Sequence, residues 1–341
     1  MSALQMLNLE NIAASEIGLT ENMMTENSGR GIAEVIVAAL GSDPAVKMRL
    51  GLTGVSASAV TTAAMVVCLV GNNKSGIRAL AAARHLANKG VHVAVCVVGI
   101  ERERSLLEDL KQQIRIYRQF GGQVYNKHEL FNMLQQQQQQ RGDYSSSLAS
   151  AAGRFVVSLI VDALFGLTVA FEELRTGDQA AVYELMEWSN RSEAYVLAVD
   201  VPTGIDPSSG RVSLIDGSYM YIRPRWVVAV GAPKRGLVEA ISAAHDRADA
   251  AKAVGSTTTA APAATDGIGT AAVGINTNAA GHDGVATMDS AEDEWKLYVV
   301  DMGLGSSVWR KAGTRFRKGV DFGDKWWLEM QWQTGGDDGD L

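Results

Sequence analysis

Apolar runs recur along the chain, and each is followed by a segment of different character. Six of these runs are rich in β-branched residues, and they end at Gly71, Gly99, Gly166, Gly204, Lys234 and Gly303. The runs are continuous rather than alternating, which is typical of strands that are buried on both faces. This pattern predicts a parallel sheet that is covered by helices.

The segments between these runs predict crossover helices. They span residues 76–90, 101–122 and 172–190. The first is rich in alanine and closes with a glycine at the expected C-cap position, and the second has a Gly-Gly stop. Strands that alternate with helices predict an α/β fold with a Rossmann-like, doubly wound, mostly parallel sheet in three αβα layers. Residues 20–40 predict a further helix that is either broken or tightly packed around Gly29 and Gly31.

Two stretches depart from this pattern and predict insertions. Residues 135–153 are polar and of low complexity, and they begin with six glutamines. Residues 238–294 contain no Leu, Phe, Tyr or Trp. Such a tract cannot bury enough apolar surface to offset the entropy of its ordering, so we expect it to be disordered. We therefore expect one domain over residues 8–332, followed by a tail at 333–341.

Composition narrows the class of protein. Of the 341 residues, 47% are hydrophobic and 20% are charged, which is enough for a sizeable core. The two cysteines, Cys68 and Cys96, lie within apolar runs, which favours buried thiols and a reducing compartment. No apolar stretch reaches the length that spans a bilayer. We expect a cytoplasmic protein without a membrane partner.

The net charge of −7 opposes polyanions, so contact with RNA would need a local basic patch. One cluster near the end of the chain combines basic and indole side chains. Its members are Arg310, Lys311, Arg315, Arg317 and Lys318, with Trp309, Trp326 and Trp327 nearby. Such side chains hold phosphates and stack on bases, but Arg and Trp are also enriched at protein interfaces. The cluster predicts a weak, salt-sensitive RNA patch, a dimer face or a terminal strand that packs on the sheet.

Candidate ligand-binding residues follow the predicted strands at one edge of the sheet, where open parallel sheets bind their ligands. Asn72, Asn73 and Lys74 follow the first strand and precede a helix whose N-terminus can offer N–H groups to a phosphate. A tight turn without a ligand would use the same residue types.

Two aspartates, Asp162 and Asp200, end apolar strands. A carboxylate in this position is expected to be capped, paired or directed at a ligand. Thr203 and Asp206 follow Asp200 at intervals of three, so a turn or cap explains part of the pattern. The histidines show no metal-ligand spacing and no Cys-x-x-Cys pair is present, which argues against a structural metal site. Gly-x-Ser-x-Gly is also absent, which argues against an α/β-hydrolase.

Five motifs then occur in a fixed order. They are GNN at 71–73, RHLANKGVHV at 84–93, VDALFG at 161–166, AVDVPTGIDPSSG at 198–210 and VGAPKRGL at 230–237. Together they resemble the YjeF N-terminal domain, whose best-known members are NAD(P)H-hydrate epimerases. If the chain is such an epimerase, the resemblance implies a potassium site at Asn73, Asp162 and Thr203, with Asp162 as a candidate acid–base group and Asp200 facing the nicotinamide nucleotide.

The loop after the first strand departs from the epimerase pattern GNNGGDG. Between GNN and RHL this chain has two residues more than the epimerases, and the aspartate of that pattern is absent between Asn73 and Leu80. After the second strand, where the epimerases usually have a lysine, this chain has VVGIERER. The longer loop, MMTENSGRGIAEV at 23–35 and AGTRFRKGVDFGDKWW at 312–327 resemble a second branch, the C-terminal domain of fungal enhancer of mRNA-decapping protein 3.

This second resemblance implies a non-catalytic scaffold that forms homodimers, binds decapping-complex proteins, and supports RNA binding and assembly of cytoplasmic P-bodies. No cofactor is required, and a nicotinamide or adenine nucleotide is a candidate ligand. The candidate nucleotide-binding residues are Asn72, Asn73, Lys74, Asp162, Gly166, Asp200 and Thr203. The alternative function is that of an NAD(P)H-hydrate epimerase.

Overall fold

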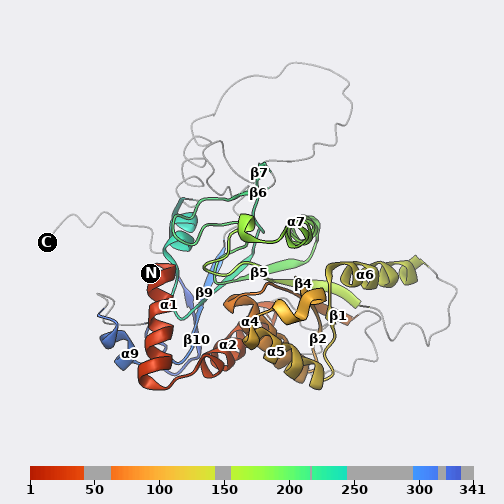
Figure 1. The fold of residues 1–341 in the computed structure, drawn as a ribbon. Helices are drawn as coiled ribbons and strands as arrows, with labels where there is room; N and C mark the ends of the chain where they lie inside the picture. Colours follow the sequence, from red (N-terminus) through yellow and green to blue (C-terminus); the bar gives the residue numbers. More distant parts are fainter. Residues whose placement is uncertain (42–62, 143–154, 216, 244–294, 314–319, 332–341) are drawn as a thin grey trace, which may run out of the picture.

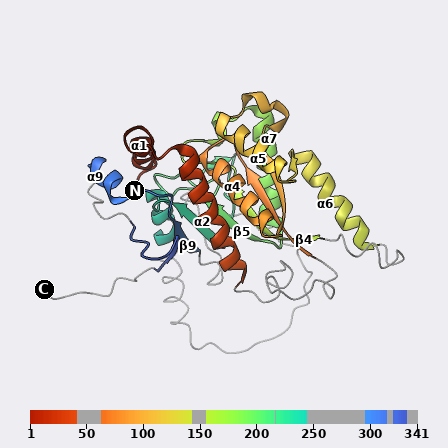
Figure 2. The same ribbon diagram turned by 90° about the horizontal axis from the view of Figure 1, so that it is seen from below.

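The computed structural model has a central sheet with helices on both faces (Figures 1 and 2). It describes residues 1–41, 63–142, 155–215, 217–243, 295–313 and 320–331. Eight strands form one sheet in the order β10-β9-β8-β5-β4-β1-β2-β3. All neighbouring strands are parallel except β10, which pairs with β9 in the antiparallel sense. The predicted α/β fold with a mostly parallel sheet is confirmed.

The six predicted apolar runs are all strands of this sheet. They form β1 (Ala63–Val70), β2 (His92–Val97), β4 (Phe155–Ala163), β5 (Tyr195–Val199), β8 (Trp226–Val230) and β9 (Lys296–Val300). The two edge strands, β3 (Val124–Tyr125) and β10 (Trp327–Met330), are too short to produce a clear pattern in the sequence. A separate hairpin consists of β6 (Leu214–Ile215) and β7 (Ser218–Tyr219).

Side chains of the central strands alternate between the two faces of the sheet, where they join three hydrophobic clusters. On β1, Val66 and Cys68 belong to one core, whereas Met65 and Val67 belong to the core on the opposite face. This arrangement explains the continuous apolar runs, because every residue of such a strand is buried. Both cysteines are buried and free, and burial raises the pKa of each thiol to about 12. The thiols are therefore protonated at neutral pH and unreactive.

Helices cover the two faces. The first core lies under α1 (Ala3–Ile12), α2 (Glu21–Gly41), α4 (Lys74–Asn88), α5 (Glu108–Gln119) and α9 (Ser306–Lys311), and the second under α6 (Lys127–Gly142) and α7 (Thr176–Arg191). A π-helical turn (Ala13–Ile17) follows α1, and 3-10 turns lie at Ile100–Ser105 and Phe171–Glu173. None of the described helices is long and apolar enough to cross a membrane.

Helix α2 is continuous and packs tightly against α4. A Cβ atom on Gly29 would lie only 2.6 Å from Cβ of Ala81, so glycine lets the two helix backbones approach. Of the two sequence-based alternatives for this helix, tight packing is the correct one.

The folded part of the chain extends beyond the bounds expected from the sequence. Met6 of α1 is fully buried, so ordered structure starts before residue 8. Residues 135–142 continue α6, because glutamine is a good helix former. Residues 235–243 form a helix that buries Ile241, so the second insertion starts after this helix rather than at residue 238. The remainder of both insertions and the tail at 333–341 lie outside the described residues.

The candidate site lies where the chain changes the side of the sheet to which it adds strands. From the adjacent strands β1 and β4, the chain adds β2 and β3 on one side and β5, β8 and β9 on the other. Ligands of open α/β sheets bind at the carboxyl ends of the strands at this point. The two strand ends approach closely, since a Cβ atom on Gly71 would lie 1.8 Å from the carbonyl oxygen of Leu164. Only glycine fits there.

Replacing residues 244–294 by a short Gly/Ser linker should leave the domain folded. The composition of this segment offers little apolar surface to bury, and the entropy of loop closure grows only slowly with length. Thermal unfolding should stay cooperative, with a free energy of unfolding within about 1 kcal/mol of the original. As a contrast, Ile241→Ala should lower it by about 2–4 kcal/mol. Loss of cooperative unfolding in the shortened chain would contradict the prediction.

Candidate functional site

A cleft of about 200 Å³ lies at the carboxyl ends of β1, β2 and β4. Asn72 and Asn73 line it from the loop after β1, and the ion pair between Arg102 and Asp178 (2.6 Å) lies in its wall. Oδ1 of Asn72 accepts a hydrogen bond from the backbone N–H of Leu107 (2.8 Å), which ties this loop to the start of α5. The cleft is smaller than the roughly 300–1,000 Å³ of typical small-molecule sites.

Asn73 connects the cleft to α4. Its Oδ1 accepts the backbone N–H of Gly76 (3.0 Å), and its Nδ2 donates to the carbonyl oxygen of Leu164 (2.8 Å). Gly166 adjoins this side chain, because a Cβ atom on it would lie 3.0 Å from Oδ1 of Asn73. Helix capping thus accounts for Asn73 without a ligand.

Asp162 is 1% exposed and bonds within the protein. Its Oδ1 accepts hydrogen bonds from the Thr203 hydroxyl (2.7 Å) and the Leu164 N–H (3.3 Å), and its Oδ2 accepts the Thr203 N–H (2.8 Å). Burial raises the pKa of Asp162 to about 6, although these hydrogen bonds favour the charged form.

Asp200 is held in a left-handed backbone conformation (φ +68°) and is also 1% exposed. Its Oδ1 accepts hydrogen bonds from the Val230 N–H (2.9 Å) and from Nζ of Lys234. Its Oδ2 accepts the Ser75 hydroxyl (3.1 Å) and lies 3.7 Å from the guanidinium of Arg78. Burial alone would raise the pKa of Asp200, but the two cations outweigh it and hold the pKa below its ordinary value.

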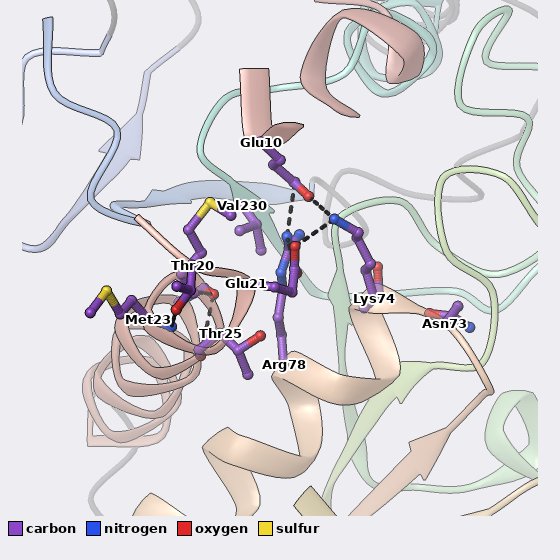
Figure 3. Close-up of polar contacts among 12 residues, drawn as sticks. Glu10, Thr20, Glu21, Met23, Thr25, Asn73, Lys74, Arg78 and Val230 are labelled. Carbon is purple, nitrogen blue, oxygen red and sulfur yellow. Dashed lines mark hydrogen bonds and ion pairs between the residues drawn. The ribbon is translucent and has the colours of Figure 1, made fainter. Parts of the chain in front are cut away.

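Arg78 is the centre of a buried ion network (Figure 3). Its guanidinium donates to Oε1 of Glu10 (2.8 Å) and lies 3.5 Å from Oε1 of Glu21. Lys74, one turn earlier on α4, donates to the same two carboxylates. Burial would lower the pKa of Arg78 and raise that of Glu10, but their mutual attraction reverses both effects. Both side chains are therefore charged in the folded protein.

With Asp200 and Lys234 included, the network contains three carboxylates and three cations. Its members come from α1, α2, α4, the end of β5 and the loop after β8. Because the charges balance, the cluster carries no excess charge of either sign. It therefore joins five separate segments at the edge of the sheet.

The three residues that the resemblance assigns to a potassium site lie around Leu164. A cation of this kind needs oxygen atoms that are free to replace its hydration shell. Here Oδ1 of Asn73 and both oxygens of Asp162 already accept N–H or O–H donors, and the Thr203 hydroxyl accepts the Phe165 N–H (3.2 Å). These bonds leave further lone pairs on the Asn73 and Asp162 oxygens, so the hydrogen bonds alone do not prevent these residues from ligating a cation. No cluster of His, Cys, Asp or Glu suited to a metal occurs among the described residues.

The predicted nucleotide-binding residues gather at one edge of the sheet but do not all face the cleft. Asn72 and Asn73 line it, Lys74 is directed at Glu10 and Glu21, and the aspartates bond within the protein. The role of Arg78 was not predicted from the sequence. The available signal was a second cation one turn after Lys74 in a helix otherwise rich in alanine.

The basic cluster near the end of the chain is only partly described. Arg310 and Lys311 are exposed on α9, and Lys311 pairs with Glu16 (2.7 Å). Trp309 is 5% exposed and its Nε1 donates to the Leu304 carbonyl (3.0 Å), so it packs in the core and does not offer a stacking surface. This corrects the grouping of Trp309 with the exposed patch. Three further cluster members, Arg315, Arg317 and Lys318, lie outside the described residues.

The other two tryptophans differ from each other. Trp326 is 54% exposed, and the guanidinium of Arg30 lies 5.3 Å from its ring. Trp327 packs against Tyr298 in an edge-to-face arrangement at 5.7 Å. Of the three indoles, Trp326 is the one exposed enough to contact a partner.

Fold and site together define an open α/β domain with a cleft at its topological switch point. Residues 21–236 match the family described as YjeF-related protein N-terminus. The chain belongs to this family. The structure is also similar to the crystal structure of yeast ynu0, YNL200c, with a TM-score of 0.57 and 19% identity over 96% of this chain and 97% of that one. At this identity the similarity supports the fold alone.

Several curated relatives are enzymes. The bifunctional NAD(P)H-hydrate repair enzyme Nnr of Moorella thermoacetica is 28% identical over 70% of this chain, and the NAD(P)H-hydrate epimerase of Dehalogenimonas lykanthroporepellens is 25% identical over 68%. The enhancer of mRNA-decapping protein 3 of Saccharomyces cerevisiae is 27% identical over 43%. The matches cover 37%, 74% and 25% of these relatives, respectively.

The stability of the protein should fall between about pH 4 and pH 6 through Asp162. The folded protein retains the Asp162 proton up to about pH 6, whereas the unfolded chain loses it near pH 3.8. The proton on Asp162 therefore stabilises the folded protein fully below the pKa of the unfolded chain. This stabilisation is lost as pH rises through the pKa of the folded protein. The free energy of unfolding of Asp162→Asn, minus that of the original protein, should rise by up to about 3 kcal/mol from pH 4 to pH 7 in denaturant titrations. A constant or falling difference would contradict the raised pKa.

Proposed function

We propose that the chain is a non-catalytic scaffold domain of the kind found in enhancers of mRNA decapping. In this role it forms homodimers, binds decapping-complex proteins in cytoplasmic P-bodies, binds RNA weakly and requires no cofactor. The observation that carries the proposal is the burial of the two aspartates at the strand ends, Asp162 and Asp200, which are each 1% exposed.

An epimerase needs an acid or base within hydrogen-bond reach of its substrate. Both oxygens of Asp200 are engaged by Lys234, Val230 and Ser75, and its pKa is held low. The pKa of Asp162 is closer to neutral pH, but its oxygens accept hydrogen bonds from Thr203 and Leu164. Neither aspartate lines the cleft. This argues against proton transfer to a bound ligand.

The ion network strengthens the argument. Lys74 and Arg78 follow the first strand, where the epimerase pattern has small residues and an aspartate. Their partner Glu10 is 1% exposed, and neither cation lines the cleft. Breaking a buried pair leaves an uncompensated charge, which makes rearrangement around a substrate unfavourable.

The cleft itself is retained, so loss of catalysis need not remove ligand binding. Asn72 lines it with a side-chain amide, and Arg102, whose side chain is 41% exposed, is a cation in its wall. These groups suit part of a nicotinamide or adenine nucleotide. Such a ligand would act as a bound signal and not as a substrate.

The second candidate function is that of an NAD(P)H-hydrate epimerase. The observation in its favour is the extent of the matches, since the enzymes align with 68–70% of this chain and the yeast enhancer of mRNA-decapping protein 3 with 43%. In this alternative, Asp162 would be the acid–base group, after displacement of the bonds described above.

Purified protein should not interconvert the two epimers of hydrated NADH or NADPH, even with potassium present. The reason is that neither Asp162 nor Asp200 lines the cleft, and the Asp178 carboxylate in its wall is paired with Arg102. Misplacement of an acid–base group reduces the rate by orders of magnitude. The measurement is epimer composition by chromatography, with Asp162→Asn as the control. Turnover that disappears in the control would favour the epimerase over the scaffold.

The protein should also be a dimer at micromolar concentration, with twice the mass of the chain in multi-angle light scattering. Three exposed apolar side chains, Leu4, Ile17 and Met23, lie near the N-terminus and support a contact there. Ile17→Glu combined with Met23→Glu should weaken the dimer, whereas Leu214→Glu on the separate hairpin should not. A monomer at all concentrations would count against the scaffold, because joining complexes needs more than one copy.

A further inference from the structure

A groove lies at the opposite edge of the sheet from the candidate cleft, near the amino ends of β4 and β5. It consists of two cavities of about 340 and 410 Å³ that meet at Leu134, Trp188 and Arg191. Each cavity is larger than the cleft at the carboxyl edge. Helices α6 and α7 form its sides, and these two helices lie next to each other in both views (Figures 1 and 2).

The floor of this groove is apolar. Phe155 and Val157 are alternate residues of β4, so their side chains are on the same face of the sheet, and both are only partly buried. Trp188 of α7 packs against Phe131 of α6 with ring centroids 5.9 Å apart. This aromatic pair holds the two helices in place, and the groove is therefore formed before any ligand arrives.

The rim of the groove has one more carboxylate than it has cations, so its net charge is negative. Three carboxylates, Glu184, Glu187 and Glu193, lie along it, against Arg191 and the Lys127 that pairs with Glu184. The side chain of Arg191 is 75% exposed, and its ion pair with Glu187 is of the i,i+4 type on a helix surface. Such pairs contribute little, so a basic side chain of a ligand can replace Arg191 beside Glu187.

From the floor and the rim together, we propose that this groove binds a short linear peptide of another protein, with apolar side chains flanked by lysine or arginine. The apolar side chains would fill the space beside Leu134 and Trp188, as anchors do in helix-lined grooves. The basic flanks would pair with the rim carboxylates. The proposal does not depend on the absence of catalysis at the other edge of the sheet.

The same charges disfavour two other occupants. Nucleic acid would be repelled by the rim carboxylates. A second copy of the chain in a two-fold symmetric contact would bring two rims of the same net negative charge together, which is unfavourable. A peptide with basic flanks satisfies both the apolar floor and the acidic rim.

The test begins with selection of displayed random short peptides on the full-length chain. Enriched peptides are then synthesised with a fluorescent label and titrated by polarisation against the original protein and three variants. Glu187→Lys with Glu193→Lys reverses the rim, and Leu134→Asp places a charge on the floor. Glu108→Lys, on α5 and 85% exposed, is the matched control outside the groove. Circular dichroism and thermal unfolding establish that each variant is folded.

Enriched peptides should combine apolar residues with lysine or arginine. Their affinity should fall at least about tenfold in the rim variant and in Leu134→Asp, stay unchanged in Glu108→Lys, and weaken with added salt. The proposal is overturned if no peptide is enriched, if enriched peptides lack basic residues, or if the rim variant binds them as tightly as the original. It is also overturned if Leu134→Asp dissociates a dimer while peptide binding is unchanged, because the groove is then a contact between copies. Should Leu134→Asp fail to fold, the rim variant alone decides.

Discussion

The buried guanidinium of Arg78 is the charge on which the arrangement of this site depends. It contacts Glu10 of α1, approaches Glu21 of α2 and lies 3.7 Å from Asp200 at the end of β5. Taking these charges out of water is unfavourable, and the balanced network compensates for it only while every partner is present. The N-terminal helices, the central crossover helix α4 and the edge of the sheet are therefore held in one relative position. Asp200, which could otherwise face a ligand, is part of the same structure.

The consequence for function follows from where this network lies. In open α/β sheets, the carboxyl ends of the central strands are the usual place for ligands, and this family includes NAD(P)H-hydrate epimerases. Here that edge has a small cleft bounded by Asn72 and Asn73, while the carboxylates of Asp162 and Asp200 beside it are turned into the protein. The enclosure of the two aspartates is the reason we propose a scaffold role for this domain. The apolar groove at the amino edge is the separate surface at which we propose that a peptide binds.

Much of the fold was predictable from the sequence because the central strands are buried on both faces. Continuous apolar runs such as the one that ends at Gly71 have no other simple explanation, and the crossover helices have clear stops. The edge strand β3 was not predictable, because two residues carry no periodicity. At the site, the aspartates were recognisable from their positions at strand ends, but their partners were not. Glu10 and Arg78 are 68 positions apart in the sequence, and only the folded chain brings them together.

The most direct test of this account is the coupling free energy between Arg78 and Glu10 in a double-mutant cycle. Unfolding free energies of Arg78→Met, Glu10→Gln and the double variant are compared with that of the original protein. The account predicts that Arg78→Met destabilises by about 3–5 kcal/mol, because it leaves carboxylates buried without their partner. The double variant should be more stable than the sum of the single effects predicts, by at least about 1 kcal/mol. Additive effects of the two substitutions would contradict the claim that this buried pair organises the site.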